Sequence, residues 1–290
     1  MVLIQCQTRK EAQPIIRYFR LMYDSSFKSY PVYSKQEMAL IISGAGAFCA
    51  CSASSYLLSR YEEQIKNLLY IHIGLAGSFD TSFETGEMVI GNKVTSTLGK
   101  SGYYPDLLMK THLKEAHIVS LNNFPSKVTP DLIDAVYDIG AYGFSESAFS
   151  FLGPHQIIVA KIISSPYKER HPLPSFATDE LLFNKLEYLD LLIHKYFLDR
   201  DSCLSLQQST AELLKLHRHL VEHLKLSETL SIELKKHLSW SFKAHLHHDS
   251  VTQSLKQVDR IVEETLHSRV LSKKEGIREY KRLKDQLLSF

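Results

Sequence analysis

Residues that break helices are nearly absent from the last third of the chain. Eleven of the twelve glycines lie at or before Gly153, and all nine prolines lie at or before Pro174, in a chain of 290 residues. Glycine and proline mark most turns, so a sequence without them can form long helices but not a loop-rich region. We therefore expect the architecture to change about 60% of the way along the chain.

Other absences limit the possible classes of protein. The four cysteines, Cys6, Cys49, Cys51 and Cys203, form no CxxC pair and no metal-type spacing, so we expect reduced thiols, no metal and no cofactor. No apolar run approaches the ~20 residues that span a bilayer. The first ten residues, MVLIQCQTRK, lack the basic and apolar regions of a signal peptide. The net charge of +2 gives no support for a nucleic-acid partner. We expect a cytoplasmic protein that binds no membrane.

The first part of the chain alternates strand-like and helix-like segments. This alternation favours a mostly parallel sheet with helices on both faces, which is an α/β fold. In such a sheet, ligands bind beyond the carboxyl ends of the strands. Strands are expected at 2–7, 39–43, 68–73, 87–94, 117–121 and 157–164, and helices at 11–22, 47–60 and 131–152.

The rest of the chain is predicted to be helical. Residues 164–178 contain three prolines and are expected to form a loop, and leucines at 3–4 spacing then predict four or five helices in 179–290. Capping boxes predict helix starts at Ser205, Ser250 and Ser272, each with Gln or Glu three residues later. We therefore divide the chain into an α/β core, 1–177, and a helical extension, 178–290.

Two glycine-rich strand ends stand out in the α/β part. Gly44 and Gly46 lie in SGAGA (43–47), and Gly74 and Gly77 lie in YIHIGLAGSF (70–79). Glycine at a strand end lets backbone N–H groups approach a ligand. Neither segment is a P-loop or a complete dinucleotide fingerprint. Taken alone, such a glycine pair is more often a tight turn between a strand and a helix than a ligand site.

The order of the segments carries more information than either glycine pair. TRKEAQPII, IISGAGAFCACSA, YIHIGLAGSF, TGEMVIGNKVTS, VYDIGAYGFSESA and IVAKIISSP follow one another between residues 8 and 166. This succession resembles the nucleoside phosphorylase superfamily, most closely its methylthioadenosine/S-adenosylhomocysteine nucleosidase branch. The resemblance implies a phosphorylase-like mixed central sheet, a purine nucleoside ligand and a homodimer, and it leaves phosphate open as a second ligand. The helical extension goes well beyond the short helical tail expected of that family.

The resemblance also implies catalytic roles, two of which the chain departs from. Glu11 matches the glutamate that activates water, although a glutamate in the first turn of a helix is also favoured by the helix dipole. Gly140 stands where the acid that holds the sugar hydroxyls is expected, and Ser165 stands where the aspartate that protonates the base is expected. Ser165 can form a hydrogen bond, but it cannot act as a carboxylic acid.

The resemblance assigns ligand contacts to further positions. Ala76 and Gly77 match the pair beside the base, and Ile139 matches an apolar residue against the sugar. Phe124 fits the aromatic residue that stacks on the purine, although it can equally be a core phenylalanine. The expected ligand-binding residues are Gly44, Gly46, Ala76, Gly77, Phe124, Asp138, Ile139 and Gly140.

Two functional hypotheses follow. One is a nucleosidase-like hydrolase in which Glu11 activates water and Ser165 holds the base. The other is a non-catalytic pseudoenzyme or interaction protein, in which the core binds a nucleoside and the helical region docks a partner or caps the pocket. The missing acids at Gly140 and Ser165 favour altered or lost hydrolysis, because losing a general acid costs ~10²–10⁴ in rate.

Overall fold

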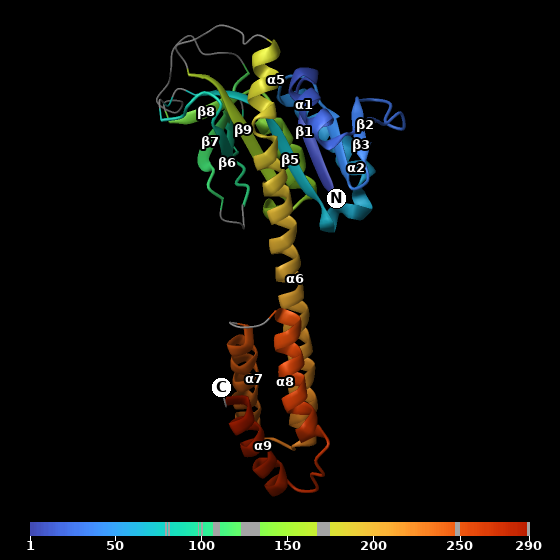
Figure 1. Ribbon diagram of the computed structural model, residues 1–290, viewed down its shortest axis with the longest axis vertical. Coiled ribbons are helices and arrows are strands. Elements are labelled where there is room, and N and C mark those ends of the chain that lie inside the picture. Colours follow the sequence, from blue (N-terminus) through green and yellow to red (C-terminus); the bar gives the residue numbers. More distant parts are fainter. Residues whose placement is uncertain are drawn as a thin grey trace. The chain divides into compact units, whose positions relative to one another are not determined.

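The computed structural model divides the chain into two compact units, Met1–His194 and Lys195–Phe290 (Figure 1). It describes residues 1–78, 80, 82–97, 99, 101–106, 111–122, 134–166, 175–246 and 250–288. The first unit contains a sheet with its helices, and the second is helical. The boundary between the units lies inside the long helix α6, Leu186–His223.

The first unit is built on a mixed sheet, as expected from the resemblance. The strand order is β2-β3-β4-β1-β5-β8-β7-β6-β9, and an added β5–β9 pairing closes the last five strands into a ring. β1 pairs in parallel with β4 and with β5. β8 is antiparallel to β5, and β6 is antiparallel to β9. The strands are β1 Val2–Cys6, β2 Met22–Tyr23, β3 Val32–Lys35, β4 Met38–Ile42, β5 Leu69–Ser78, β6 Met88–Ser96, β7 Lys114–Ser120, β8 Ala135–Asp138 and β9 Ile157–Pro166.

Two pairs of helices pack on this sheet. α2 (Ala47–Arg60) packs on α4 (Ala141–Phe151), and both share a core with Leu3, Ile41 and Tyr70 of the sheet. α1 (Arg9–Phe19) packs on α5 (Ser175–Phe183) and against β1 and β4. An ion pair between Arg17 and Asp179 joins α1 to α5. Two short 3₁₀ helices, η1 (Glu62–Asn67) and η2 (Pro154–Gln156), lead into β5 and β9.

The structure corrects three expectations about local structure. The expected loop 164–178 is too long at both ends, because β9 runs to Pro166 and α5 begins at Ser175. The segment 131–152 was expected to be one helix, but its described part contains β8, then Gly140 as the N-cap of α4. No helix starts at Ser205, because α6 runs through this position without a break from Leu186 to His223. Capping side chains cannot start a new helix where the preceding one continues. The boxes at Ser250 and Ser272 do form, at the starts of α8 and α9.

The helical unit has its own apolar core. α7 (Glu228–Leu246), α8 (Val251–Leu266) and α9 (Lys273–Leu288) pack together with the C-terminal part of α6. Leu220, Leu234, Val258 and Leu283 contribute fully buried side chains, one from each helix. Within the described residues, no helix combines the length and the hydropathy that crossing a membrane requires.

The only glycine of this unit lies at a close approach of two backbones. A Cβ on Gly276 of α9 would overlap the carbonyl oxygen of Leu224, just after α6 ends. Gly276 is buried and has an ordinary helical backbone, so its role is the absence of a side chain. This explains why a glycine persists in a region that otherwise lacks it.

We predict that Gly276→Ala destabilises the helical unit by about 1–3 kcal/mol, because the added methyl group must push two backbones apart. Trp240, the single tryptophan, lies in this unit, so its fluorescence during urea denaturation reports the change. The exposed control Ser239→Ala should change the free energy of unfolding by less than about 0.5 kcal/mol. Equal stability of the two variants would contradict the assigned role.

Candidate functional site

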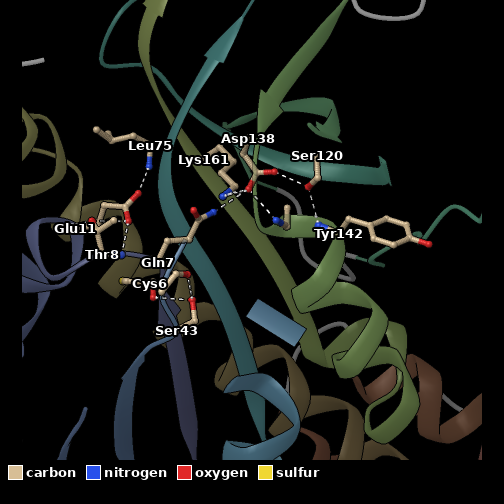
Figure 2. A network of polar contacts seen from close by, with 12 residues as sticks. Cys6, Gln7, Thr8, Glu11, Ser43, Leu75, Ser120, Asp138, Tyr142 and Lys161 are labelled. Atoms are coloured by element: carbon tan, nitrogen blue, oxygen red, sulfur yellow. Dashed lines mark hydrogen bonds and ion pairs between the residues drawn. The ribbon is translucent and has the colours of Figure 1, made fainter. Parts of the chain in front are cut away.

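The carboxylate of Glu11 is bound by backbone and side-chain donors of the protein itself. Thr8 caps α1, and its N–H and its hydroxyl each donate to Oε2 of Glu11 at 2.9 Å. The N–H of Leu75 in β5 donates to Oε1, also at 2.9 Å (Figure 2). Glu11 is 7% exposed. These three hydrogen bonds use most of the accepting capacity of a carboxylate, so Glu11 joins the start of α1 to β5.

Gly74 makes this contact possible. A Cβ at position 74 would lie 2.5 Å from Oε1 of Glu11, so a larger residue would displace the carboxylate. The first glycine of the YIHIGLAGSF segment therefore makes room for a protein side chain in the structure.

A second carboxylate forms a buried ion pair in the centre of the unit. Asp138 ends β8, and its Oδ2 lies 2.6 Å from Nζ of Lys161 in β9, with both side chains almost fully buried. Ser120 donates to Oδ1 at 2.6 Å, and the N–H of Ala141, in the first turn of α4, donates to Oδ2 at 2.8 Å (Figure 2). The amide of Gln7 lies at 3.5 Å from Oδ2. The carboxylate thus ties together β7, β8, β9 and α4.

This environment keeps Asp138 ionised. Burial by itself would raise the pKa of Asp138, but the charge of Lys161 and the hydrogen bond from Ser120 outweigh burial and lower the pKa below its usual value. An aspartate that is held ionised cannot supply the proton that a departing base needs.

His72 lies beside the pair and is neutral. It is in β5 and fully buried, and its ring lies 5.0 Å from that of Phe144 in α4. Burial, reinforced by the positive charge of Lys161, lowers the pKa of His72 well below its usual value. Neither ring nitrogen has a hydrogen-bond partner among the described residues.

Two of the expected ligand positions are filled by neighbouring side chains. A Cβ on Gly77 would overlap the ring of Tyr137, which is 7% exposed and paired with Gly77 between β5 and β8. A Cβ on Gly140 would overlap the amide of Gln7. The Tyr137 ring therefore fills the space next to Gly77, one of the two positions that the resemblance puts beside a base.

A cavity of about 320 Å³ lies nearby, at the N-terminal ends of α2 and α4 and the carboxyl ends of β6 and β7. Of the expected ligand residues, it brings together Gly46 and Ile139. Gly44 and Gly46 have φ of 85° and 97°, so the turn that leads into α2 needs glycine at both positions. The cavity is lined by Ala45, Gly46, Ala47, Phe48, Ser96, Gly99, Ser120, Leu121, Asn122, Ile139 and Tyr142.

The described lining is neutral. It includes no Asp, Glu, His, Lys or Arg. Tyr142 is its one titratable group, and burial together with the nearby charge of Glu146 raises the pKa of Tyr142. Ser120 connects the cavity lining to the buried ion pair. Its hydroxyl group donates a hydrogen bond to Asp138 and accepts one from the N–H of Tyr142 at 2.8 Å.

Some expected residues do not join this cavity. Not part of its lining are Glu11, Gly44, Ala76, Gly77, Asp138 and Gly140. Ser165 pairs with Gly77 in the β5–β9 ladder, but its side chain lies outside the described part of the structure. Phe124 also lies outside the described residues.

A larger cavity, of about 550 Å³, lies elsewhere on the first unit. It is lined by residues 84–87, Lys114, Leu181, Asn184 and Lys185. Two of these residues, Lys114 and Glu87, form an ion pair. This cavity shares no lining residue with the smaller cavity. Among the described residues, no group of three or more His, Cys, Asp or Glu side chains is placed to hold a metal ion.

Sequence reasoning missed Lys161, His72, Gln7 and Tyr137. A signal for Lys161 and His72 was present in the sequence. The mostly apolar strands IIVAKIIS (157–164) and LYIHIG (69–74) each contain one basic residue. Lysine is almost never fully buried unless it is paired. The partner lies far away in sequence, so the sequence could not identify Asp138 as the other half of the pair.

No family model and no curated protein sequence matches the chain. Solved structures do share its fold. The methylthioadenosine/S-adenosylhomocysteine nucleosidase of Campylobacter jejuni superposes with a TM-score of 0.53 at 13% identity, covering 67% of this chain and 97% of the nucleosidase. A variant of the Helicobacter pylori nucleosidase, solved with 5'-methylthioadenosine in its active site, gives a TM-score of 0.55 at 11% identity. The superposition covers 67% of this chain and 98% of that variant.

A third structure, a mutant of the futalosine hydrolase of Helicobacter pylori, gives a TM-score of 0.50 at 11% identity, covering 67% of this chain and 98% of the hydrolase. The chain therefore has the fold of the nucleoside phosphorylases and nucleosidases, as the resemblance implied. At these identities the likeness extends to the fold alone.

We predict that Lys161→Met destabilises the protein by about 3–5 kcal/mol, because it leaves the charge of Asp138 buried and unpaired. The double variant Lys161→Met/Asp138→Asn removes both charges and should recover a large part of that loss. Chemical denaturation of the three proteins measures both effects. A single variant as stable as the wild type would show that the pair does not hold the site together.

Stability should also depend on the protonation of His72. The unfolded chain binds a proton at His72 near its ordinary pKa of about 6.5, whereas the folded protein does not. Stability is therefore lost as the pH falls below that value. Between pH 7 and pH 5.5 the wild type should lose about 1 kcal/mol more than His72→Leu. Parallel stability curves for the two proteins would contradict this prediction.

Proposed function

We propose that the first unit is a ligand-binding protein of the nucleosidase fold that takes a purine nucleoside-type molecule and has lost N-glycosidic bond hydrolysis. The observation that carries this proposal is the neutral lining of the 320 Å³ cavity. Hydrolysis of a ribose–base bond needs an acid for the base and a group that activates water, and both jobs need titratable side chains. The described lining offers none that titrates near neutral pH.

The position and the chemistry of the cavity support a nucleoside-type ligand. It lies beyond the carboxyl ends of β6 and β7, where open α/β sheets bind ligands. Phe48, which is 83% exposed, and Tyr142 offer aromatic faces to a base, and Asn122 offers an amide for hydrogen bonds. The solved nucleosidase with 5'-methylthioadenosine shows that this fold can hold such a molecule. No cation lies among the described lining residues, so we do not expect phosphate to bind.

The two nearby carboxylates support loss of activity. Glu11 accepts hydrogen bonds from Thr8 and Leu75, and Asp138 is paired with Lys161. Either group would have to break these interactions before it could act on a ligand. We extend the proposal to the cytoplasm as the location, from the composition of the sequence, and to a homodimer as the assembled form, from the resemblance.

One observation favours a second candidate, a slow hydrolase. Glu11 is buried at the start of α1, which is where the resemblance puts the residue that activates water. If Leu75 released Oε1, that oxygen could accept a hydrogen bond from a water molecule. The activity assay separates the two candidates.

We predict no release of free base when the protein is incubated with methylthioadenosine, adenosine, inosine or uridine, with or without phosphate. Methylthioadenosine or adenosine should instead raise the melting temperature, by about 2–4 °C for each kcal/mol that the bound ligand adds to the free energy of unfolding. Ile139→Trp should remove this shift by filling the cavity. Phe151→Trp, a similar change at an exposed position at the end of α4, should retain it.

Release of base at ordinary nucleosidase rates, abolished by Glu11→Gln, would refute the loss of activity and support the hydrolase. A melting temperature that no purine nucleoside changes would refute the binding proposal. These two results are independent, so the experiment tests each half of the proposal separately.

A further inference from the structure

The helical unit carries a surface of mixed apolar and basic character on α7 and α9. Ile232, Trp240, Ile277 and Leu288 are 54%, 48%, 41% and 38% exposed, and large apolar side chains that gather on one surface mark an interaction site. They lie on the two helices whose other faces form the core of the unit. We call this surface the α7–α9 face.

The spacing places these residues in two stripes. On α7, Ile232, Lys236, Trp240 and Lys243 follow one another at four, four and three residues. On α9, Ile277, Lys281, Lys284 and Leu288 follow at four, three and four residues. Residues three and four apart on a helix share one face, so each stripe is continuous.

Contacts between the helices bring the two stripes together. Tyr280 donates a hydrogen bond to Glu233, and the charge of Lys284 acts on His237. Both pairs advance in the same direction along the chain, so α7 and α9 run parallel to each other (Figure 1). Each stripe lies next to the residues that make these contacts, on the side away from the apolar core. The stripes therefore lie side by side on one surface of the helix pair, and we call the strip between them the groove.

The charge of the groove is positive. Lys236, Lys243 and Lys281 are exposed along it, and Lys284 is half-buried between the helices. The acidic groups close to it are Glu228, one turn before Ile232, Glu233, which accepts the hydrogen bond from Tyr280, and Asp285, so the lysines remain in excess. An apolar floor with basic edges is complementary to a helix that carries an apolar stripe flanked by Asp and Glu.

We propose that the α7–α9 face binds an acidic amphipathic helix of a partner protein. The apolar side chains are about half exposed, so they form a floor that a helix can cover, rather than protruding groups that would enter a bilayer. A nucleic acid would leave the four apolar side chains without partners. The proposal is independent of the ligand proposed for the first unit, and it gives the helical unit a function of its own.

The test uses the full chain and a synthetic probe, a fluorescently labelled helical peptide of Glu, Ala and Leu with leucine at 3–4 spacing. The peptide should bind with a Kd in the micromolar range, and Trp240 emission should shift to shorter wavelength as the ring is covered. The same peptide with Gln in place of Glu should bind at least about tenfold more weakly. Raising the salt concentration should weaken binding of the acidic peptide, because screening reduces its charge pairs.

A pair of matched variants locates the site. Lys236→Glu/Lys281→Glu reverses two charges on the groove and should weaken peptide binding about tenfold or more. Lys235→Glu/Arg282→Glu makes the same change in net charge on the same two helices, at exposed positions one residue away that point elsewhere. This control should bind the peptide within about twofold of the wild type, and both variants should keep the wild-type circular dichroism.

Three results would overturn the proposal. One is no binding of the acidic peptide at about 100 µM. Another is an equal loss of binding in the groove variant and its control. The third is binding to phosphatidylserine vesicles that exceeds binding to the peptide and is lost in the groove variant, which would make the face a membrane-binding surface.

Discussion

The buried ion pair between Lys161 and Asp138 is the interaction on which the first unit depends most. Removing two charges from water costs several kcal/mol for each ion, so the pair can exist only where hydrogen bonds complete its environment. Ser120 and the N–H of Ala141 do this for Asp138. Their donors come from β7 and from the first turn of α4, where the helix dipole also favours a negative charge. One carboxylate thereby fixes three strands and a helix relative to one another.

The same interactions explain why we infer that chemistry has been lost. The groups that could act on a nucleoside in this crevice serve the structure instead, since Glu11 joins α1 to β5 and Asp138 neutralises Lys161. The Tyr137 ring and the Gln7 amide occupy the space over Gly77 and Gly140. The neutral cavity at the ends of α2 and α4 remains available. We therefore propose that this chain keeps a hollow for a ligand while Glu11 and Asp138 serve its structure.

Much of the fold could be predicted from the sequence, because its signals are local. The limits of α2 agree with the expected 47–60, and the helical C-terminal region follows from the loss of glycine and proline. β8 was missed because a four-residue strand followed at once by a helix has too short a pattern to separate from that helix. Ser205 was misleading for a related reason, since a capping box forms only where the residues before it are not already part of a helix.

The site was harder to predict because it depends on contacts distant in sequence. Glu11 and Asp138 were identified by resemblance, but their partners Leu75 and Lys161 could be found only in three dimensions. The most direct measurement is a crystal structure of the protein soaked with adenosine. The account predicts density in the cavity beside Ile139 and Tyr142, with the Lys161–Asp138 pair intact. A base beside Gly77, with Tyr137 displaced and Glu11 released from Leu75 to hold a water molecule, would contradict it.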